Sequence, residues 1–225
     1  MKEFYSLQEF ATILKIEDKL NEATDSTGAG LHEVHLTDLA TARKIANDLA
    51  LKYQSRTIDD LLPKFDQNYQ FVKTKIQIGI YKRKDMPVVG TSDVKKLQHM
   101  LRDDHLHLSD MFGSNEHGKG DDRLRVHVTS EVCGKLKPLQ KQVYYEKGIV
   151  YIAKNGVEGE SKGLEKVRLC ISKDNYIIDG HHRWLTACLI DPKMPVHVFR
   201  IGLNGKELLD LMNAYTDHVG NERNV

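Results

Sequence analysis

The sequence predicts a mixed α/β (α+β) protein, with a mainly helical N-terminal extension over residues 1–122 and an α/β domain over residues 123–225. Two observations favour this division. Apolar residues before the boundary recur mostly at helical spacing, whereas short alternating strands and helical segments follow one another from Leu124 onward. In addition, acidic residues outnumber basic ones up to residue 122 and the balance then reverses, although the formal net charge is only +1. A basic C-terminal part suits a polyanion such as a nucleotide or DNA.

Within the extension, apolar residues recur every third or fourth position in residues 4–14, and again in a segment that runs from Thr37 to Tyr53. This spacing predicts two helices, the second with Thr37 as its N-cap. Residues 74–81 alternate polar and apolar side chains, which predicts a half-buried strand. Residues 103–122 are polar and rich in Gly and His, which predicts an exposed loop that contains the domain boundary.

The C-terminal part is predicted to alternate strands with helices, because its apolar residues change from a period of two to helical spacing and back. In chain order the expected elements are a strand from Leu124 to Val128, a helix over 140–155, a loop over 156–163, a hairpin formed by 167–171 and 176–178, a helix over 181–190, a strand over 196–201 and a last helix over 205–215.

Composition excludes several classes of protein. No stretch approaches the ~20 consecutive apolar residues that a membrane-spanning helix needs, and residues 1–10 lack the pattern of a signal peptide. Cys133, Cys170 and Cys188 lie among apolar residues without metal-type spacing, as expected of reduced thiols. We therefore expect a cytoplasmic protein with no membrane partner.

The most informative segment is the turn Asp179-Gly180-His181-His182-Arg183, which follows an apolar strand and opens a helix. Such a turn aims the first N–H groups of the helix at one point, and this arrangement suits a phosphate. Gly180 allows close approach, Arg183 can donate two hydrogen bonds to phosphate oxygens, and Asp179 could hold Mg²⁺ or orient a histidine. The alternative is an ordinary capped helix, with Asp179 as the N-cap, one solvated histidine and Arg183 paired with a carboxylate.

The order of strand, Lys-Pro turn, helix, hairpin and Asp-Gly-His-His-Arg-Trp resembles the ParB/sulfiredoxin superfamily over residues 124–201. The corresponding turn is Gly-Glu-Arg-Arg in ParB partition proteins, which bind CTP, and Gly-Cys-His-Arg in sulfiredoxin, which uses ATP. The version in this protein is similar to that of the free-serine kinases of this fold and of ParB-like bacteriophage proteins. The resemblance implies that Gly180, His181, His182 and Arg183 bind the nucleotide phosphates, and that Asp179 places the metal.

The same resemblance directs attention to the loop before the helix. The free-serine kinases carry a glutamate general base just after the proline, where this protein has Gln140. Glutamine cannot accept a proton, but Gln140 could orient an acceptor hydroxyl, and Glu146 and Glu131 are the other carboxylates that could serve as the base. Lys137 flanks this loop and is expected to bind the nucleotide. His181 replaces the cysteine of sulfiredoxin, which disfavours that chemistry.

Two basic segments are weaker signals. Residues 82–84 are Lys-Arg-Lys, typical of a solvated turn or of a contact to a phosphate backbone. Lys135, Lys137 and Lys141 precede Tyr144-Tyr145, and basic groups beside aromatic rings could hold DNA and stack an exposed base. The alternative for this second segment is a set of solvated lysines with one tyrosine in the core.

These observations predict a kinase, a phosphotransferase with an alcohol group as acceptor, that uses ATP or another nucleoside triphosphate with Mg²⁺. The expected acceptor is the hydroxymethyl group of a modified pyrimidine in phage DNA, presented as a flipped or single-stranded base, or free serine. The long extension favours DNA. The alternatives are a ParB-like DNA-binding protein that uses a nucleotide as a switch, and a ParB-like nuclease. If a bacteriophage encodes the protein, the expected location is the host cytoplasm.

Overall fold

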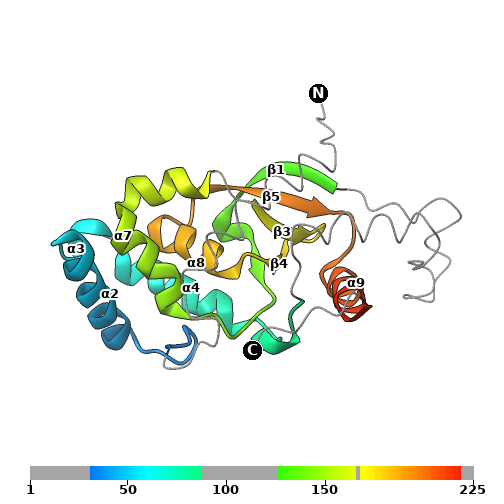
Figure 1. The fold of residues 1–225 in the computed structure, drawn as a ribbon, viewed down its shortest axis with the longest axis horizontal. Helices are drawn as coiled ribbons and strands as arrows, with labels where there is room; N and C mark the ends of the chain where they lie inside the picture. The colour runs from blue at the N-terminus through cyan, green and yellow to red at the C-terminus, as the bar shows by residue number, and fades with distance from the viewer. Residues whose placement is uncertain (1–30, 88–125, 166–167, 219–225) are drawn as a thin grey trace, which may run out of the picture.

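The computed structural model describes residues 31–87, 126–165 and 168–218. In these residues a five-stranded mixed sheet is combined with helices, and the N-terminal region is helical, which confirms the predicted α+β class (Figure 1). The predicted helix at 4–14 and the predicted loop at 103–122, with the domain boundary inside it, lie outside the described residues.

The N-terminal region contributes α2 (Leu39–Gln54), α3 (Ile58–Leu61), α4 (Phe65–Gln77) and the 3-10 turn η1 (Arg83–Asp85). The predicted N-cap of α2 was wrong by one residue. The Asp38 side chain accepts the N–H of Thr41 and so caps the helix, whereas the Thr37 hydroxyl donates to the carbonyl of Glu33. A carboxylate at this position also interacts favourably with the helix dipole.

The predicted strand over 74–81 was also wrong, because α4 continues through Gln77. The buried apolar side chains of α4 lie on one face at helical spacing; they are Phe65, Tyr69, Val72 and Ile76. Burial of this face decides the conformation, and the short polar–apolar alternation that follows it is too brief to compete. Only Tyr81 of the predicted strand makes a β-bridge, and its partner is Gln140.

The strands are β1 (Val126–Val132), β2 (Lys137–Pro138), β3 (Arg168–Ser172), β4 (Tyr176–Asp179) and β5 (Pro195–Ile201), in the spatial order β1-β5-β3-β4-β2. β3 and β4 form the predicted antiparallel hairpin, and β5 lies parallel to β3 and antiparallel to β1. β2 follows the 3-10 turn η2 (Cys133–Lys135) and pairs in parallel with β4. This last pairing brings the backbone that follows β2 toward the end of β4.

Three helices complete the described fold, namely α7 (Tyr145–Leu164), α8 (His181–Ile190) and α9 (Gly205–His218). α8 has the bounds that the sequence predicts, and α9 begins where predicted. The predicted helix over 140–155 begins later, and the predicted loop over 156–163 belongs to α7. Gly156 has φ 68° and ψ 168°, so α7 bends there and then continues as helix.

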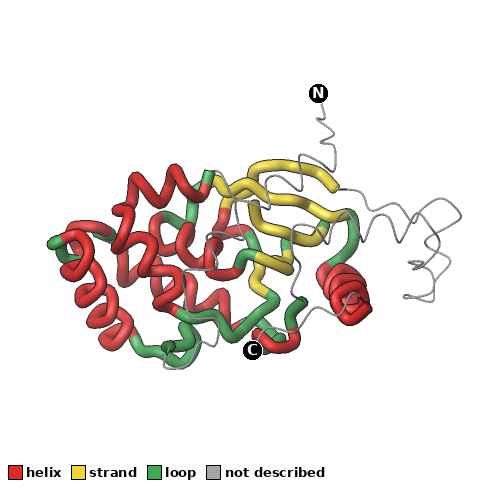
Figure 2. Tube along the Cα trace, in the orientation of Figure 1, coloured by secondary structure: helices red, strands yellow, loops and turns green. Residues whose placement is uncertain are grey.

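The two faces of the sheet are covered differently (Figure 2). On one face a large apolar cluster joins β3, β4 and β5 to α7 and α8, and it also takes in α2 and α4 of the N-terminal region. On the other face a smaller cluster is formed mainly with α9. Among the helices described, none combines the length and apolar character needed to cross a bilayer.

Candidate anion site at the start of α8

The turn between β4 and α8 depends on the backbone of Gly180, which has φ 95° and ψ 22°. A Cβ atom at this position would lie 2.5 Å from Cδ2 of Leu169, so a side chain would be both strained and obstructed. The Trp184 N–H donates to the Gly180 carbonyl as the first helical hydrogen bond. Helix geometry therefore leaves the N–H groups of His181 and His182 without an acceptor inside α8.

The two histidines hold the loop of residues 139–144 against this helix start. His181 is 4% exposed, and its Nε2 accepts the backbone N–H of Gln140 at 3.1 Å. His182 Nε2 accepts the backbone N–H of Tyr144 at 3.2 Å, and its ring stacks on the Tyr144 ring at a centroid distance of 6.3 Å. A backbone N–H can only donate, so each Nε2 is an acceptor and each neutral ring carries its proton on Nδ1.

The surroundings of the histidines favour their neutral forms. The pKa of His181 is lowered to about 4, mainly by burial; Asp179 opposes this shift, and the positive charges of Arg83 and Arg183 add to it. Burial likewise lowers the pKa of His182 well below its usual value, and the nearby positive charges of Arg83, Lys147 and Arg183 act in the same direction. At neutral pH both rings are therefore uncharged acceptors.

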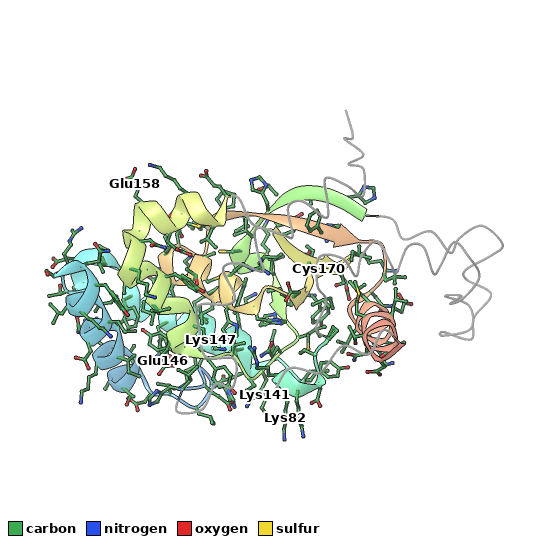
Figure 3. All side chains as sticks on the ribbon, viewed as in Figure 1. Lys82, Lys141, Glu146, Lys147, Glu158 and Cys170 are labelled. Atoms are coloured by element: carbon green, nitrogen blue, oxygen red, sulfur yellow. The ribbon has the colours of Figure 1, made fainter. Side chains whose placement is uncertain are left out.

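Three cationic side chains from separate elements converge around His182: Arg83 of η1, Lys147 of α7 and Arg183 of α8. The Arg83 guanidinium carbon lies 5.9 Å from the centroid of the Tyr144 ring, and Lys147 Nζ lies 5.7 Å from it. Lys147 is largely buried, and Figure 3 shows it in the first turn of α7. Positive charges gathered at a helix N-terminus produce a potential that attracts anions.

One carboxylate accompanies these cations. Asp179 Oδ2 lies 2.9 Å from an Nη atom of Arg183, and the Asp179 side chain is 49% exposed. Asp179 does not cap α8, because Gly180 is the N-cap and no capping hydrogen bond to a side chain is present there. The ion pair between Arg183 and Asp179 agrees with the capped-helix alternative, whereas the expected role of Asp179 as the N-cap does not.

The residues described contain no group of three or more His, Cys, Asp or Glu side chains that could hold a metal. These residues therefore do not form a metal site built from protein ligands alone. Mg²⁺ does not need one, because it is commonly bound by one or two carboxylates together with substrate phosphates and water. Asp179, partly exposed at the end of β4, fits this mode of binding.

Gln140 lies beside the turn, but its side chain is already hydrogen-bonded within the loop. Gln140 is buried, its N–H reaches His181, and its side-chain Nε2 donates to the carbonyl of Gln142. Lys137 is paired in register with Tyr176 and places its Nζ 4.9 Å from the centroid of that ring. Lys137 thus contacts β4 three residues before Asp179.

The two other carboxylates that the sequence offers as a base have partners of their own. Glu146 accepts the backbone N–H of His32 at 2.9 Å and lies 2.5 Å from Nδ1 of the same residue. Glu131 pairs with Arg200 at 2.7 Å. Neither carboxylate is among the charges that shift the pKa of His181 or His182.

The tyrosines beside this loop do not form an open stacking platform. Tyr144 is 8% exposed and Tyr145 is fully buried, where it packs edge-on against Phe65 and Tyr69. Burial raises the pKa of the Tyr145 hydroxyl well above its usual value. Both tyrosines therefore belong to the interior.

Sequence reasoning identified the turn but missed two of its cations. Arg83 belongs to the basic segment 82–84, which could have drawn attention to it, and Lys147 stands in an apolar stretch with no distinguishing pattern. Lys82 and Lys84, on either side of Arg83, are exposed, as is Lys141. The N–H of Lys141 donates to the carbonyl of Tyr81 at 2.8 Å, and Figure 3 shows Lys82 and Lys141 at the same edge of the molecule.

Comparison of the sequence with models of known protein families gave no match, and neither did comparisons with curated proteins and with solved structures. The resemblance to the ParB/sulfiredoxin superfamily therefore stays a prediction from the turn and the order of elements.

Proposed function

We propose that the protein is a kinase that binds a nucleoside triphosphate at the start of α8 and transfers its terminal phosphoryl group to a hydroxyl. The observation that carries this proposal is the convergence of Arg83, Lys147 and Arg183, from three elements, on the helix start. Phosphoryl transfer depends mainly on positioning and on neutralising the charge of the phosphate oxygens. Cations that are held in place before the substrate arrives meet both requirements.

Mg²⁺ is the expected metal, with Asp179 as its protein ligand beside phosphate oxygens and water. When bound, it would neutralise part of the phosphate charge. Arg183, which pairs with Asp179 in the structure, then has the phosphate as an alternative partner for its guanidinium. The N–H groups of His181 and His182 complete the proposed phosphate contacts.

For the acceptor we favour DNA that carries a hydroxymethylated pyrimidine, which would make the protein a DNA-modification enzyme. The exposed lysines Lys82, Lys84 and Lys141 support this choice, because they lie on the two segments that meet beside the site and can pair with backbone phosphates. A reacting base would be flipped or single-stranded. Free serine, which needs no such basic surface, is the second acceptor to test.

The direct test is incubation of the protein with γ-labelled ATP and Mg²⁺ in the presence of serine, plain DNA or hydroxymethylated DNA. We expect label in the hydroxymethylated DNA. Arg83→Ala, Lys147→Met and Arg183→Ala should each reduce transfer by about 10²-fold, as expected for removal of a charge-stabilising group. Arg56→Ala removes an exposed arginine elsewhere and should leave transfer unchanged. Full activity in all three site variants would rule out this site.

A nucleotide-dependent switch is the second candidate function. It is favoured by the contacts that engage Glu146 with His32 and Glu131 with Arg200, and by the inability of Gln140 to accept a proton. In the same assay a switch would bind nucleotide without labelling any acceptor, and a nuclease would cleave the DNA. Either result would reject transfer as the activity.

A further inference from the structure

An exposed strip of isoleucines and lysines lies on the segment that follows α4 and on the loop of residues 139–144. Its members, called the Ile–Lys strip below, are Ile78, Ile80, Lys82, Lys84 and Lys141. Ile78 is 58% exposed and Ile80 is 69% exposed, which is unusual for large apolar side chains. We propose that the strip binds duplex DNA, with its lysines on backbone phosphates and Ile80 inserted between bases as a wedge. This role deepens the proposed function and rests on it for the choice of DNA as the acceptor.

Backbone contacts hold Ile80 firmly against the loop. The N–H groups of Ile80 and Tyr81 both donate to the carbonyl of Leu139, at 3.0 and 3.1 Å. Just before them, a Cβ atom on Gly79 would lie 2.9 Å from the carbonyl oxygen of Gln140, so the two backbones are in direct contact. Isoleucine is also stiff at χ1, because its Cβ is branched. Ile80 is therefore an apolar side chain on a fixed support, as a wedge requires.

The pairing of the two segments also decides which side chains face outward. Tyr81 packs against the apolar cluster formed with α9, whereas its neighbours Ile80 and Lys82 are exposed. Successive side chains of an extended segment point to opposite sides, so Ile80 and Lys82 share one side. The exposed Lys141, whose N–H donates to the Tyr81 carbonyl at 2.8 Å, lies at the same edge as Lys82 (Figure 3). The wedge residue is thus accompanied by cations from both segments.

The charge of the strip suits a polyanion. Its three lysines are accompanied by one carboxylate on residues 78–86 and 139–144, that of Asp85, which accepts the N–H of Lys82 at 3.2 Å. Lysines on such a surface bind DNA through its phosphates. Proteins that bind the minor groove also insert apolar side chains, isoleucine included, between base steps and unstack them. Duplex DNA therefore fits both parts of the strip, whereas a purely apolar partner would leave the lysines unused.

The strip adjoins the anion site through Arg83, which lies between two of its lysines. The Arg83 guanidinium carbon lies 5.9 Å from the centroid of the Tyr144 ring, and its backbone N–H donates to Oε1 of Gln142 at 3.2 Å. An acceptor base has to leave the stack before its hydroxyl can react, and unstacking costs free energy. One segment would therefore open the duplex with Ile80 on its outer side and supply a site cation on its inner side.

The salt dependence of DNA binding tests the lysines. Affinity for a short duplex is measured by fluorescence anisotropy in nucleotide-free protein, between about 50 and 200 mM salt. Lys82→Ala, Lys84→Ala and Lys141→Ala should each lower the slope of log affinity against log salt by about one, because one phosphate contact is lost. Lys44→Ala, at an exposed position of α2, is the matched control and should keep the wild-type slope. Wild-type slopes in all three strip variants would overturn the proposal.

Base unstacking tests the wedge. The duplex carries 2-aminopurine beside a hydroxymethylated pyrimidine, and the fluorescence of 2-aminopurine rises when the stack opens. We expect this rise with wild type and with Ile80→Leu, which keeps the apolar bulk. Ile80→Ser should abolish the rise and weaken binding by about 10-fold without changing the salt slope, because the lost contact is apolar. Leu51→Ser, at an exposed leucine of α2, should behave as wild type.

A mismatched duplex separates a wedge from a simple apolar contact. A mismatched base is easier to unstack, so Ile80→Ser should recover most of its affinity when the modified pyrimidine is mispaired. An equal loss of affinity on paired and mispaired DNA would refute the wedge, and so would a full fluorescence rise with Ile80→Ser. Sedimentation tests another occupant of the strip. A wild-type dimer that Ile78→Ser or Ile80→Ser dissociates, with DNA affinity unchanged, would make the strip a protein interface instead.

The assay with γ-labelled ATP distinguishes failure of the strip from failure of the proposed function. DNA binding and unstacking as expected, without label in any acceptor, would support the strip and reject the kinase. Label in hydroxymethylated DNA at the wild-type rate with Ile80→Ser would retain the kinase and reject the wedge. Label in serine alone, by a protein that does not bind DNA, would likewise retain phosphoryl transfer and reject the strip.

Discussion

Gly180 shows how much of the site depends on one backbone conformation. Its left-handed backbone connects β4 to α8, and a Cβ atom there would also lie 3.3 Å from Nε and from an Nη atom of Arg183. Leu169 occupies the space on the other side. The residue that follows Asp179 therefore has to be glycine for steric and conformational reasons together.

Gly180→Ala should lower the free energy of unfolding by about 1–3 kcal/mol, because alanine resists a positive φ and Leu169 must move. Urea unfolding measures this value. Gly163→Ala is the matched control, since a Cβ at this exposed position of α7 meets nothing within 4 Å. Alanine should stabilise the helix there by about 0.5–1 kcal/mol. Equal effects of the two substitutions would contradict the special role of Gly180.

At the scale of elements, α8 is attached along its whole length. The loop of residues 139–144 meets its first turn, and the indole N–H of Trp184 donates to the carbonyl of Cys133 at 2.9 Å. At the far end, buried Asn68 of α4 donates to the carbonyls of Leu189 and Ile190 at 2.9 and 3.2 Å. Helix ends leave such carbonyls without partners, so the Asn68 amide caps the C-terminal end of α8 from another helix.

Asn68→Ala should lower the free energy of unfolding by about 1–3 kcal/mol, because the buried Leu189 carbonyl and the partly buried Ile190 carbonyl lose their donor. Chemical denaturation measures the change. Gln67→Ala, at the exposed neighbouring position of the same helix, should change stability by less than about 0.5 kcal/mol. A loss in Asn68→Ala no larger than that in Gln67→Ala would show that α4 does not hold the end of α8.

At the scale of the molecule, the N-terminal helices and the C-terminal elements share one core. The cluster on the helical face of the sheet contains Ala46 of α2 and Val72 of α4 together with Ile149 of α7 and Trp184 of α8. The described part of the extension therefore covers α7 and α8 directly. Separate unfolding of the two regions would expose this shared apolar surface.

We therefore expect a single cooperative unfolding transition. Trp184 is the sole tryptophan, so its fluorescence reports on α8, whereas far-UV circular dichroism reports on the helices of both regions. The two transitions should coincide. Val72→Ala creates a cavity in α4 and should lower the free energy of unfolding by about 1–3 kcal/mol. The midpoints of the two transitions should fall by the same amount. A dichroism transition that precedes the fluorescence transition would indicate two independent units.

Local elements were predictable wherever pattern and turn chemistry agreed. The β3–β4 hairpin, α8 and β5 each combine an apolar pattern with a Gly, Asn or Pro boundary, and each is present as expected. The predictions failed where a single residue or a short alternation was given too much weight. Residues 74–77 alternate but belong to α4, in which Ile76 completes the buried face, and Gly156 bends α7 without ending it.

The turn from Asp179 to Arg183 could be recognised from the sequence alone, because neighbouring residues encode a left-handed glycine between a strand and a helix. In contrast, the presence of Arg83 and Lys147 beside this turn, and the attachment of the loop to both histidines, became known from the three-dimensional fold. These residues lie far apart in the sequence and are brought together by packing of η1, the loop and α7. Contacts of this kind depend on burial across the whole core, which a local pattern does not contain.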